Sequence, residues 1–247
     1  MHLPESHTPS IEVCFTPKLV PEVQLAPGYL VVLVDILRAT TSVCAAFENG
    51  VKEILPVATT DEARALKEQG YLVALEQDGK KLDFADFGNS AFNFTREAVG
   101  GRTLVYCTTN GTRALNIVKE AECVAIGAFV NLTALTGWLI RQRKDILILC
   151  SGWKNRFCLE DTLFAGALAD RLIRSGNYGT RCDSTEAAID LWNTAKNDLT
   201  GYIEKAAHRH RLKSLGLDDV IPYSLTPDST RVVPVYRNGV ILDENNH

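Results

Sequence analysis

The stretch Leu30-Val-Val-Leu-Val-Asp35, followed by Ile-Leu-Arg38-Ala-Thr-Thr-Ser42, carries the pattern that decides the fold. An apolar run of strand length ends in an acidic residue and then opens into a short polar loop. Two later stretches repeat the pattern with a cysteine at the end of the run: Thr103 to Cys107 followed by Thr-Thr-Asn110-Gly-Thr-Arg113, and Ile146 to Cys150 followed by Ser-Gly-Trp-Lys154. Short apolar runs bounded by turn residues are typical of buried strands in a parallel sheet.

Strand and helix patterns alternate up to about Ile173, which predicts βαβ units. We therefore expect an α/β protein with three layers, α/β/α, around a mostly parallel mixed sheet. The polar segment from Ser184 to Ser214 predicts helices that form a small subdomain or lid (184–214). Val220 to Leu225 predicts a strand, and Arg231 to Leu242 predicts an antiparallel hairpin that turns at Arg237-Asn-Gly239 and joins the sheet edge.

Composition limits the classes of function. The 247 residues, 46% hydrophobic, can bury a full core, as one α/β unit over 1–247 or as two closely packed lobes. A net charge of -4 predicts no nucleic-acid partner. The apolar runs are too short to cross a membrane, and the polar stretch from Met1 to Ser10 predicts no signal peptide. Seven cysteines without a CxxC pair favour reduced thiols in a cytoplasmic protein, and a homo-oligomer is left open.

Ligands of open α/β sheets bind outside the carboxyl ends of the strands. If the three repeated strands are parallel neighbours, the residues behind them share one crevice: Asp35, Arg38, Thr108, Asn110, Arg113 and Ser151. Asp35 and Arg38 precede a helix that begins near Thr40, so this segment predicts an anion and metal site. The alternative is an aspartate that caps the helix and an arginine that pairs with it. The loop from Thr108 to Arg113 offers more donors than an ordinary loop needs, and Gly111 allows its backbone N–H groups to point at a ligand.

Four acidic residues are candidate ligands for Mg²⁺, which prefers oxygen donors: Asp35, Glu76, Glu160 and Asp161. Acids in a first helical turn also complement the helix dipole, so part of this set has a simpler explanation. Cys150 and Cys107 end strands and are either nucleophiles or small residues in tight corners. His208 and His210 lie in a basic helical segment and are predicted to face solvent.

Several of these stretches together resemble the 2-phosphosulfolactate phosphatase family. The resembling segments are Val34-Asp-Ile-Leu-Arg-Ala-Thr-Thr41, Phe87-Gly-Asn-Ser90, Thr108-Thr-Asn-Gly-Thr-Arg-Ala-Leu115, Gly127-Ala-Phe-Val-Asn131, Cys150-Ser-Gly152, Leu159-Glu-Asp161 and Ala165-Gly166. The resemblance implies an α/β enzyme that uses Mg²⁺ to hydrolyse 2-phospho-3-sulfolactate to 3-sulfolactate and phosphate, as in coenzyme M biosynthesis. This substrate is small, phosphorylated and sulfonated, and Arg38, Arg113, Lys154 and Arg156 would meet its charges.

The residues and the resemblance together give a set of expected roles. Catalytic roles are expected for Asp35, Arg38, Cys150 and Glu160. Substrate binding is expected for Arg38, Thr40, Thr109, Asn110, Gly111, Thr112, Arg113, Ser151 and Gly152. Metal binding is expected for Asp35, Glu76, Glu160 and Asp161.

The sequence leaves two other functions open. One is a haloacid-dehalogenase-like phosphatase acting on another phospho-organic acid, although Leu37 stands where that superfamily requires a second aspartate. The other is a protein that binds anions without turnover. The acidic cluster argues against it, because carboxylates beside an anion do not help to bind it.

Overall fold

The computed structural model describes residues 8–23, 27–77, 79–118 and 121–246. Residues 1–7, which include most of the stretch considered for a signal peptide, lie outside these ranges. The strands are β1 (Ile11–Cys14), β2 (Leu30–Val34), β3 (Glu53–Pro56), β4 (Leu72–Gln77), β5 (Lys80–Lys81), β6 (Thr103–Cys107), β7 (Val124–Gly127), β8 (Ile146–Cys150), β9 (Pro234–Arg237) and β10 (Val240–Asp243). Every residue of β2 and of β8 is buried, as the two unbroken apolar runs predict.

One mixed sheet contains these strands in the order β1-β8-β2-β7-β9-β10-β3-β6-β4-β5. Strands β1, β8, β2 and β7 are parallel, and so are β3, β6 and β4. The hairpin β9–β10 joins the two sets and pairs antiparallel with β7 on one side and β3 on the other. The hairpin was predicted from its Asn-Gly turn, but its expected place at the sheet edge is wrong.

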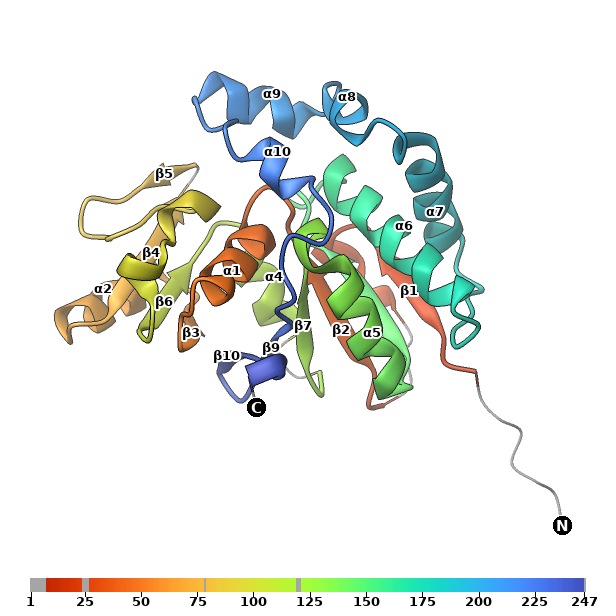
Figure 1. The fold of residues 1–247 in the computed structure, drawn as a ribbon, viewed down its shortest axis with the longest axis horizontal. Helices are drawn as coiled ribbons and strands as arrows, with labels where there is room; N and C mark the ends of the chain where they lie inside the picture. The colour runs from red at the N-terminus through yellow and green to blue at the C-terminus, as the bar shows by residue number, and fades with distance from the viewer. Residues whose placement is uncertain (1–7, 24–26, 78, 119–120, 247) are drawn as a thin grey trace, which may run out of the picture.

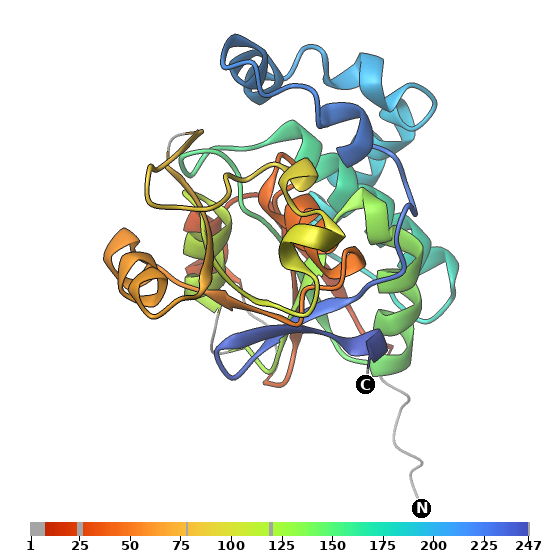
Figure 2. The same ribbon diagram turned by 60° about the vertical axis from the view of Figure 1, so that its left-hand side comes forward.

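The three repeated strands are not all neighbours. Strand β2 pairs with β8, whereas β7, β9, β10 and β3 separate β2 from β6. Each strand of a sheet is rotated relative to its neighbour by roughly 20–25°, and by more in two-stranded ribbons. The sheet therefore twists considerably between β2 and β6. The hairpin runs across the lower end of the fold in Figure 2. The loops behind β2 and β6 still meet, since the Tyr106 hydroxyl on β6 donates to the Ala39 carbonyl, 3.3 Å away.

Helices cover both faces of this sheet. They are α1 (Ala39–Glu48), α2 (Thr60–Glu68), α3 (Arg96–Val99), α4 (Gly111–Val118), α5 (Leu132–Gln142), α6 (Leu159–Arg174), α7 (Asp183–Ala195), α8 (Leu199–Ile203), α9 (Ala207–Ser214) and α10 (Ile221–Ser224), with 3-10 turns η1 (Pro17–Glu22), η2 (Ala91–Asn93), η3 (Phe129–Asn131) and η4 (Glu244–Asn246). Figure 1 shows α5 and α6 in front of β1, β2 and β7, with α4 behind them. The three-layer α/β/α prediction is confirmed.

The segment after α6 is helical as predicted, and α8, α9 and α10 lie above the strand ends in Figure 1. The predicted strand from Val220 to Leu225 is wrong, because Ile221–Ser224 forms α10. A short apolar run does not distinguish a strand from a buried helix, and Pro222 suits a first helical turn, where no backbone N–H is needed.

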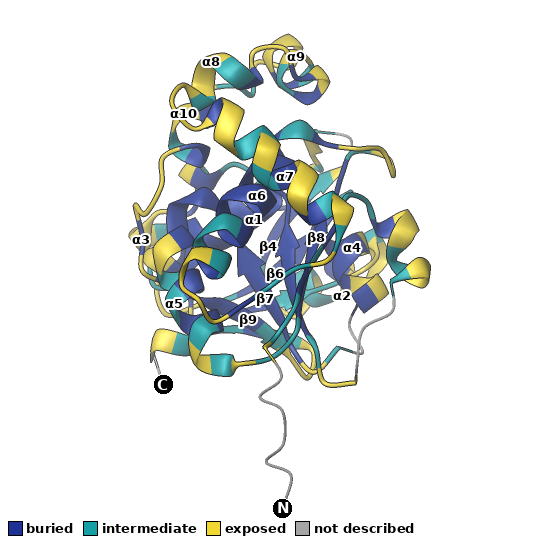
Figure 3. Ribbon diagram, turned by 90° about the vertical axis from the view of Figure 1, so that its right-hand side faces the viewer, coloured by how far each residue is buried: buried dark blue, intermediate teal, exposed yellow. Residues whose placement is uncertain are grey.

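Buried residues concentrate in the strands, in nearly all of α1 and in most of α6, while α7 to α9 carry an exposed outer surface (Figure 3). Among the described residues, no helix has both the length and the apolar composition needed to cross a bilayer.

Candidate active site

The floor of the site is built by the segment between β2 and α1. The Thr40 hydroxyl accepts from the Asp35 N–H at 3.1 Å and donates to the Asp35 carbonyl at 2.9 Å, which closes a tight turn. Asp35 Oδ1 accepts from the Ala39 N–H at 3.3 Å. Asp35 and Arg38 are both buried. Thr40, predicted to bind substrate, thus uses its hydroxyl to hold the backbone that carries Asp35.

The loop between β6 and α4 has the same construction. The Thr112 hydroxyl accepts from the Thr108 N–H at 3.2 Å and donates to the Thr108 carbonyl at 2.7 Å. Gly111 lets this loop approach the floor, because a Cβ there would lie 2.7 Å from Ala39 Cβ and 3.3 Å from Asp35 Oδ2. Two helices therefore begin side by side at Asp35. The partial positive charge at both helix N-termini favours an anion at this point, although the first N–H groups of α1, those of Ala39 and Thr40, are already bonded to Asp35.

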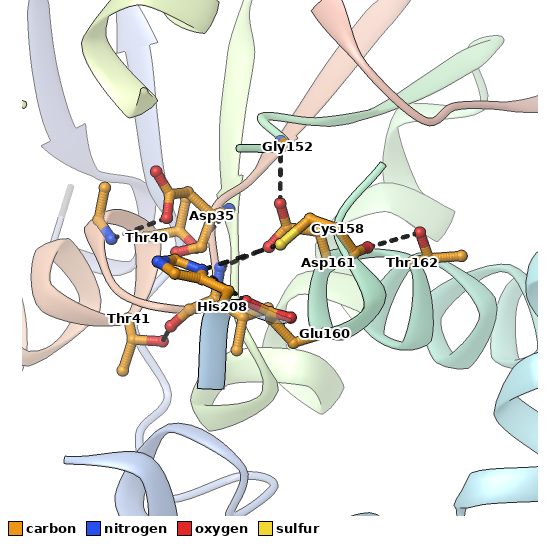
Figure 4. A network of polar contacts seen from close by, with 11 residues as sticks. Asp35, Thr40, Thr41, Gly152, Cys158, Glu160, Asp161, Thr162 and His208 are labelled. Carbon is orange, nitrogen blue, oxygen red and sulfur yellow. Dashed lines mark hydrogen bonds and ion pairs between the residues drawn. The ribbon is translucent and has the colours of Figure 1, made fainter. Parts of the chain in front are cut away.

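Helix α6 contributes two buried acids beside this floor (Figure 4). Asp161 accepts from the Ile36 N–H at 2.9 Å through Oδ1 and from the Gly152 N–H at 3.1 Å through Oδ2. It therefore fastens the loop behind β2 to the loop behind β8. Glu160 accepts from His208 Nδ1 at 2.8 Å through Oε1, whereas its buried Oε2 has no hydrogen-bond partner among the described residues.

These loops line a cavity that is open to solvent, with about 420 Å³ of space including its open mouth. The residues that line it are Asp35, Leu37, Arg38, Glu76, Gly79, Asn89, Thr108, Thr109, Asn110, Trp153, His208, Arg211 and Leu212. Of the residues expected at the site, Asp35, Arg38, Glu76, Thr109 and Asn110 line this cavity. Glu76 is held there by the Gly79 N–H and by the Thr109 hydroxyl, which donates to its Oε1 at 3.3 Å.

Other expected site residues lie around the cavity rather than in its wall. Arg113 is exposed and lines a neighbouring cleft that shares Glu76, Thr108 and Thr109 with the cavity. Cys150 is fully buried in the core, and burial raises the pKa of its thiol well above the usual value. Burial likewise raises the pKa of Cys107 to about 11. Both thiols are therefore protonated near neutral pH, which does not favour either as a nucleophile.

Ser151 and Gly152 form the turn behind β8. The Ser151 N–H donates to the Val34 carbonyl at 2.7 Å, and its buried hydroxyl has no partner among the described residues. Gly152 has φ of 62°, and a Cβ there would lie 2.3 Å from the Arg156 carbonyl oxygen. Both residues lie behind the cavity wall and shape the loop that carries Trp153.

Helix α9 forms the roof of the cavity, and this corrects the prediction that His208 faces solvent. His208 is buried, bonds to Glu160 and stacks on Trp153 with ring centroids 6.3 Å apart. His210 is exposed, as predicted. The polar composition of α9 hid this inward face. The only pattern that could have revealed it is the spacing of His208, Arg211 and Leu212, which puts all three on one side of the helix.

Sequence reasoning also missed Asn89 as a lining residue, although it lies in the Phe87-Gly-Asn-Ser90 segment. Its side-chain oxygen accepts from the Tyr106 hydroxyl, and its carbonyl accepts from Ser42 Oγ at 3.2 Å. Asn89 thus connects β6 to α1 at the edge of the cavity.

The acids of the site affect one another through their charges. Burial, helped by the charges of Glu76 and Glu160, raises the pKa of Asp35 to about 6, although His208 and the hydrogen bond from Ala39 oppose this shift. Burial, with the charges of Asp35 and Glu160, raises the pKa of Asp161 well above its usual range. Burial would raise the pKa of Glu160 too, but its hydrogen bond and charge interaction with His208 hold it below the usual value.

Mg²⁺ prefers carboxylate oxygens. Asp35 and Glu76 line the cavity, and Glu160 has a buried Oε2 without a partner among the described residues, which is an oxygen suited to a hard cation. Within the described ranges, the one group of three ligands whose atoms all lie within 4.8 Å of one another is Cys158, Glu160 and His208, and a thiol and an imidazole suit softer metals.

Asp35, the buried Arg38 and the N-termini of α1 and α4 lie together at the ends of parallel strands. This arrangement is suited to an α/β enzyme that hydrolyses phosphate esters. Comparison with known proteins agrees. The family model for 2-phosphosulpholactate phosphatase matches residues 14–239, and the chain belongs to that family.

Relatives cover most of the chain. It is 34% identical over 215 residues to a probable 2-phosphosulfolactate phosphatase of Caldanaerobacter subterraneus subsp. tengcongensis, covering 85% of this chain and 89% of the relative. Proteins of the same name from Thermotoga maritima and Gloeobacter violaceus are 35% and 36% identical, covering 85% and 91% of this chain and 90% and 94% of the relatives. The chain is thus a phosphoric monoester hydrolase, and neither alternative reading is favoured.

Proposed function

We propose that this enzyme hydrolyses 2-phospho-3-sulfolactate to 3-sulfolactate and phosphate and that it requires Mg²⁺. The observation that carries the proposal is the cavity at Asp35, where carboxylates, Arg38 and two helix N-termini meet. The names of the relatives support the substrate. The reaction would be of the coenzyme M biosynthesis type. All seven cysteines are free, which supports a cytoplasmic location.

Asp35 would hold Mg²⁺ together with Glu76 and Glu160, while Asp161 fixes the loops around it. When bound, Mg²⁺ would supply positive charge that stabilises the phosphoryl oxygens in the transition state. Arg38 would bind the phosphoryl group, and the positive ends of α1 and α4 would stabilise its charge beside Asp35. Phosphoryl transfer depends mainly on such positioning and charge stabilisation. Attack by water or by Asp35 are both compatible with this arrangement.

The test is phosphate release from 2-phosphosulfolactate with Mg²⁺ and with EDTA, for the wild type and Asp35→Asn. We expect turnover only with Mg²⁺ and a loss of about 10³-fold or more in Asp35→Asn. Asp170→Asn is the matched control, because Asp170 pairs with Arg174 on the outer part of α6. Equal rates in EDTA would refute the Mg²⁺ requirement. Turnover of other phosphate esters but not of this one would refute the substrate.

A further inference from the structure

The cavity has a guanidinium in its floor and another in its roof. Arg38 comes from the loop behind β2, and Arg211 comes from α9. Burial lowers the pKa of Arg38, and the neighbouring charges of Glu76 and Asp35 counteract that shift. Arg38 thus belongs to the acidic floor. Arg211 belongs to a different part of the wall.

The position of Arg211 follows from how α9 is anchored. His208, Arg211 and Leu212 all line the cavity, as residues i, i+3 and i+4 of one helix face must if that face points inward. His208 fixes the face through Glu160, and Leu212 is buried. The helix cannot turn Arg211 away without breaking these two contacts.

Two loops hold the Arg211 side chain in place. Its guanidinium carbon lies 5.4 Å from the centre of the Trp153 ring, in a cation–π contact. A Cβ built on Gly79 would lie 3.7 Å from Arg211 Nη2. The guanidinium therefore lies between the loop behind β8 and the turn behind β4. A guanidinium held in one orientation can donate two parallel hydrogen bonds. It therefore suits a carboxylate or a sulfonate, each of which offers two or more oxygens.

We propose that Arg211 forms a second anion subsite, which binds one of the two acidic groups, carboxylate or sulfonate, that the substrate carries in addition to its phosphate. The subsite makes the enzyme selective for phosphate esters of hydroxy acids over simple phosphate monoesters. The inference rests on the proposed function, because it takes the phosphate to bind at Asp35 and Arg38. Carboxylate and sulfonate share the chemistry that Arg211 recognises, so separate substrates must distinguish them.

The experiment compares three phosphate esters: that of lactate, with a carboxylate; that of 2-hydroxyethanesulfonate, with a sulfonate; and isopropyl phosphate, with neither. For Arg211→Gln we expect kcat/KM to fall about 10- to 100-fold on at least one acidic ester. The fall on isopropyl phosphate should be much smaller. The acidic ester with the larger loss identifies the group bound. Lys213→Gln, an exposed position on the same helix, removes the same charge and should keep the wild-type selectivity.

Equal losses on all three esters, or no loss on any, would overturn the proposal. A second readout does not need turnover: calorimetric binding of 3-sulfolactate should weaken about 10- to 100-fold in Arg211→Gln. Arg211→Lys keeps the positive charge but loses the paired N–H donors of the guanidinium, and it should retain part of this affinity. Failure of wild-type turnover would refute the proposed function, whereas unchanged binding in Arg211→Gln would refute the subsite.

Discussion

Gly111 is the residue at which the N-terminal ends of α1 and α4 come together. A methyl group there would meet Ala39 Cβ at 2.7 Å and push α4 away from Asp35. We expect Gly111→Ala to lower kcat/KM about 100-fold, because displacements of this size disturb a positioned site, and to destabilise the fold by about 1–3 kcal/mol. Gly137→Ala is the control, since a Cβ there would touch only Arg141 Nη1 at 3.7 Å. Comparable kinetics for the two variants would show that the close approach has no role.

Asp35 should make the stability of the metal-free enzyme depend on pH. Burial raises its pKa from 3.8 to about 6, so between these values the folded state binds more protons than the unfolded state. The free energy of unfolding therefore falls as pH rises through about 6. In EDTA at pH 7.5, Asp35→Asn should be more stable than the wild type by up to about 3 kcal/mol.

Urea unfolding of both proteins across pH 4 to 8 measures this effect. The difference between them should nearly disappear towards pH 4, where Asp35 is protonated in the folded state and about half protonated in the unfolded state. Added Mg²⁺ should stabilise the wild type above pH 6 and leave Asp35→Asn nearly unchanged. A difference that does not vary with pH would contradict the raised pKa.

At the level of elements, Asp161 connects the ends of β2 and β8 through two backbone hydrogen bonds. Asp161→Asn keeps one acceptor and turns an NH₂ group towards a backbone N–H. We expect a loss of about 1–3 kcal/mol in unfolding free energy together with a loss of activity. Asp170→Asn, on the same helix, removes only a partly exposed ion pair and should stay within about 0.5 kcal/mol. Similar stability changes in both variants would contradict the connecting role of Asp161.

The elements also show why sequence reasoning succeeded at one side of the site and failed at the other. The runs at β2 and β8 are apolar throughout because both faces are covered, and this pattern predicted them as buried strands of a parallel sheet. The inward face of α9 left almost no trace in the sequence, because His208 and Arg211 are polar and contact a carboxylate and the Trp153 ring rather than the aliphatic core. Hydrophobic periodicity finds helix faces that contact a core, and it does not find faces that contact a polar site.

At the scale of the whole molecule, the hairpin β9–β10 decides how the two parallel sets of strands are arranged. The pairings of β7 with β9 and of β3 with β10 join segments far apart in the chain. Local patterns predict a hairpin but do not specify its partners, so its central position could not be read from the sequence. The convergence of the β2 and β6 loops depends on that position. Thr108 to Asn110 lie at the cavity with Asp35 as predicted, although the premise of neighbouring strands was wrong. Their role in substrate binding stays a prediction.

This arrangement makes the unfolding of one strand set depend on the other. Ile241 on β10 is buried and pairs with Tyr236 on β9 and with Ile54 on β3. We expect Ile241→Ala to lower the free energy of unfolding by about 2–4 kcal/mol. The protein should still unfold in one cooperative transition at a lower midpoint temperature, with equal calorimetric and van't Hoff enthalpies. Val240→Ala, at a half-buried neighbouring position, should cost much less. Two resolved transitions in the wild type would instead show separate lobes, because a hairpin that only bridged them would let each set unfold on its own.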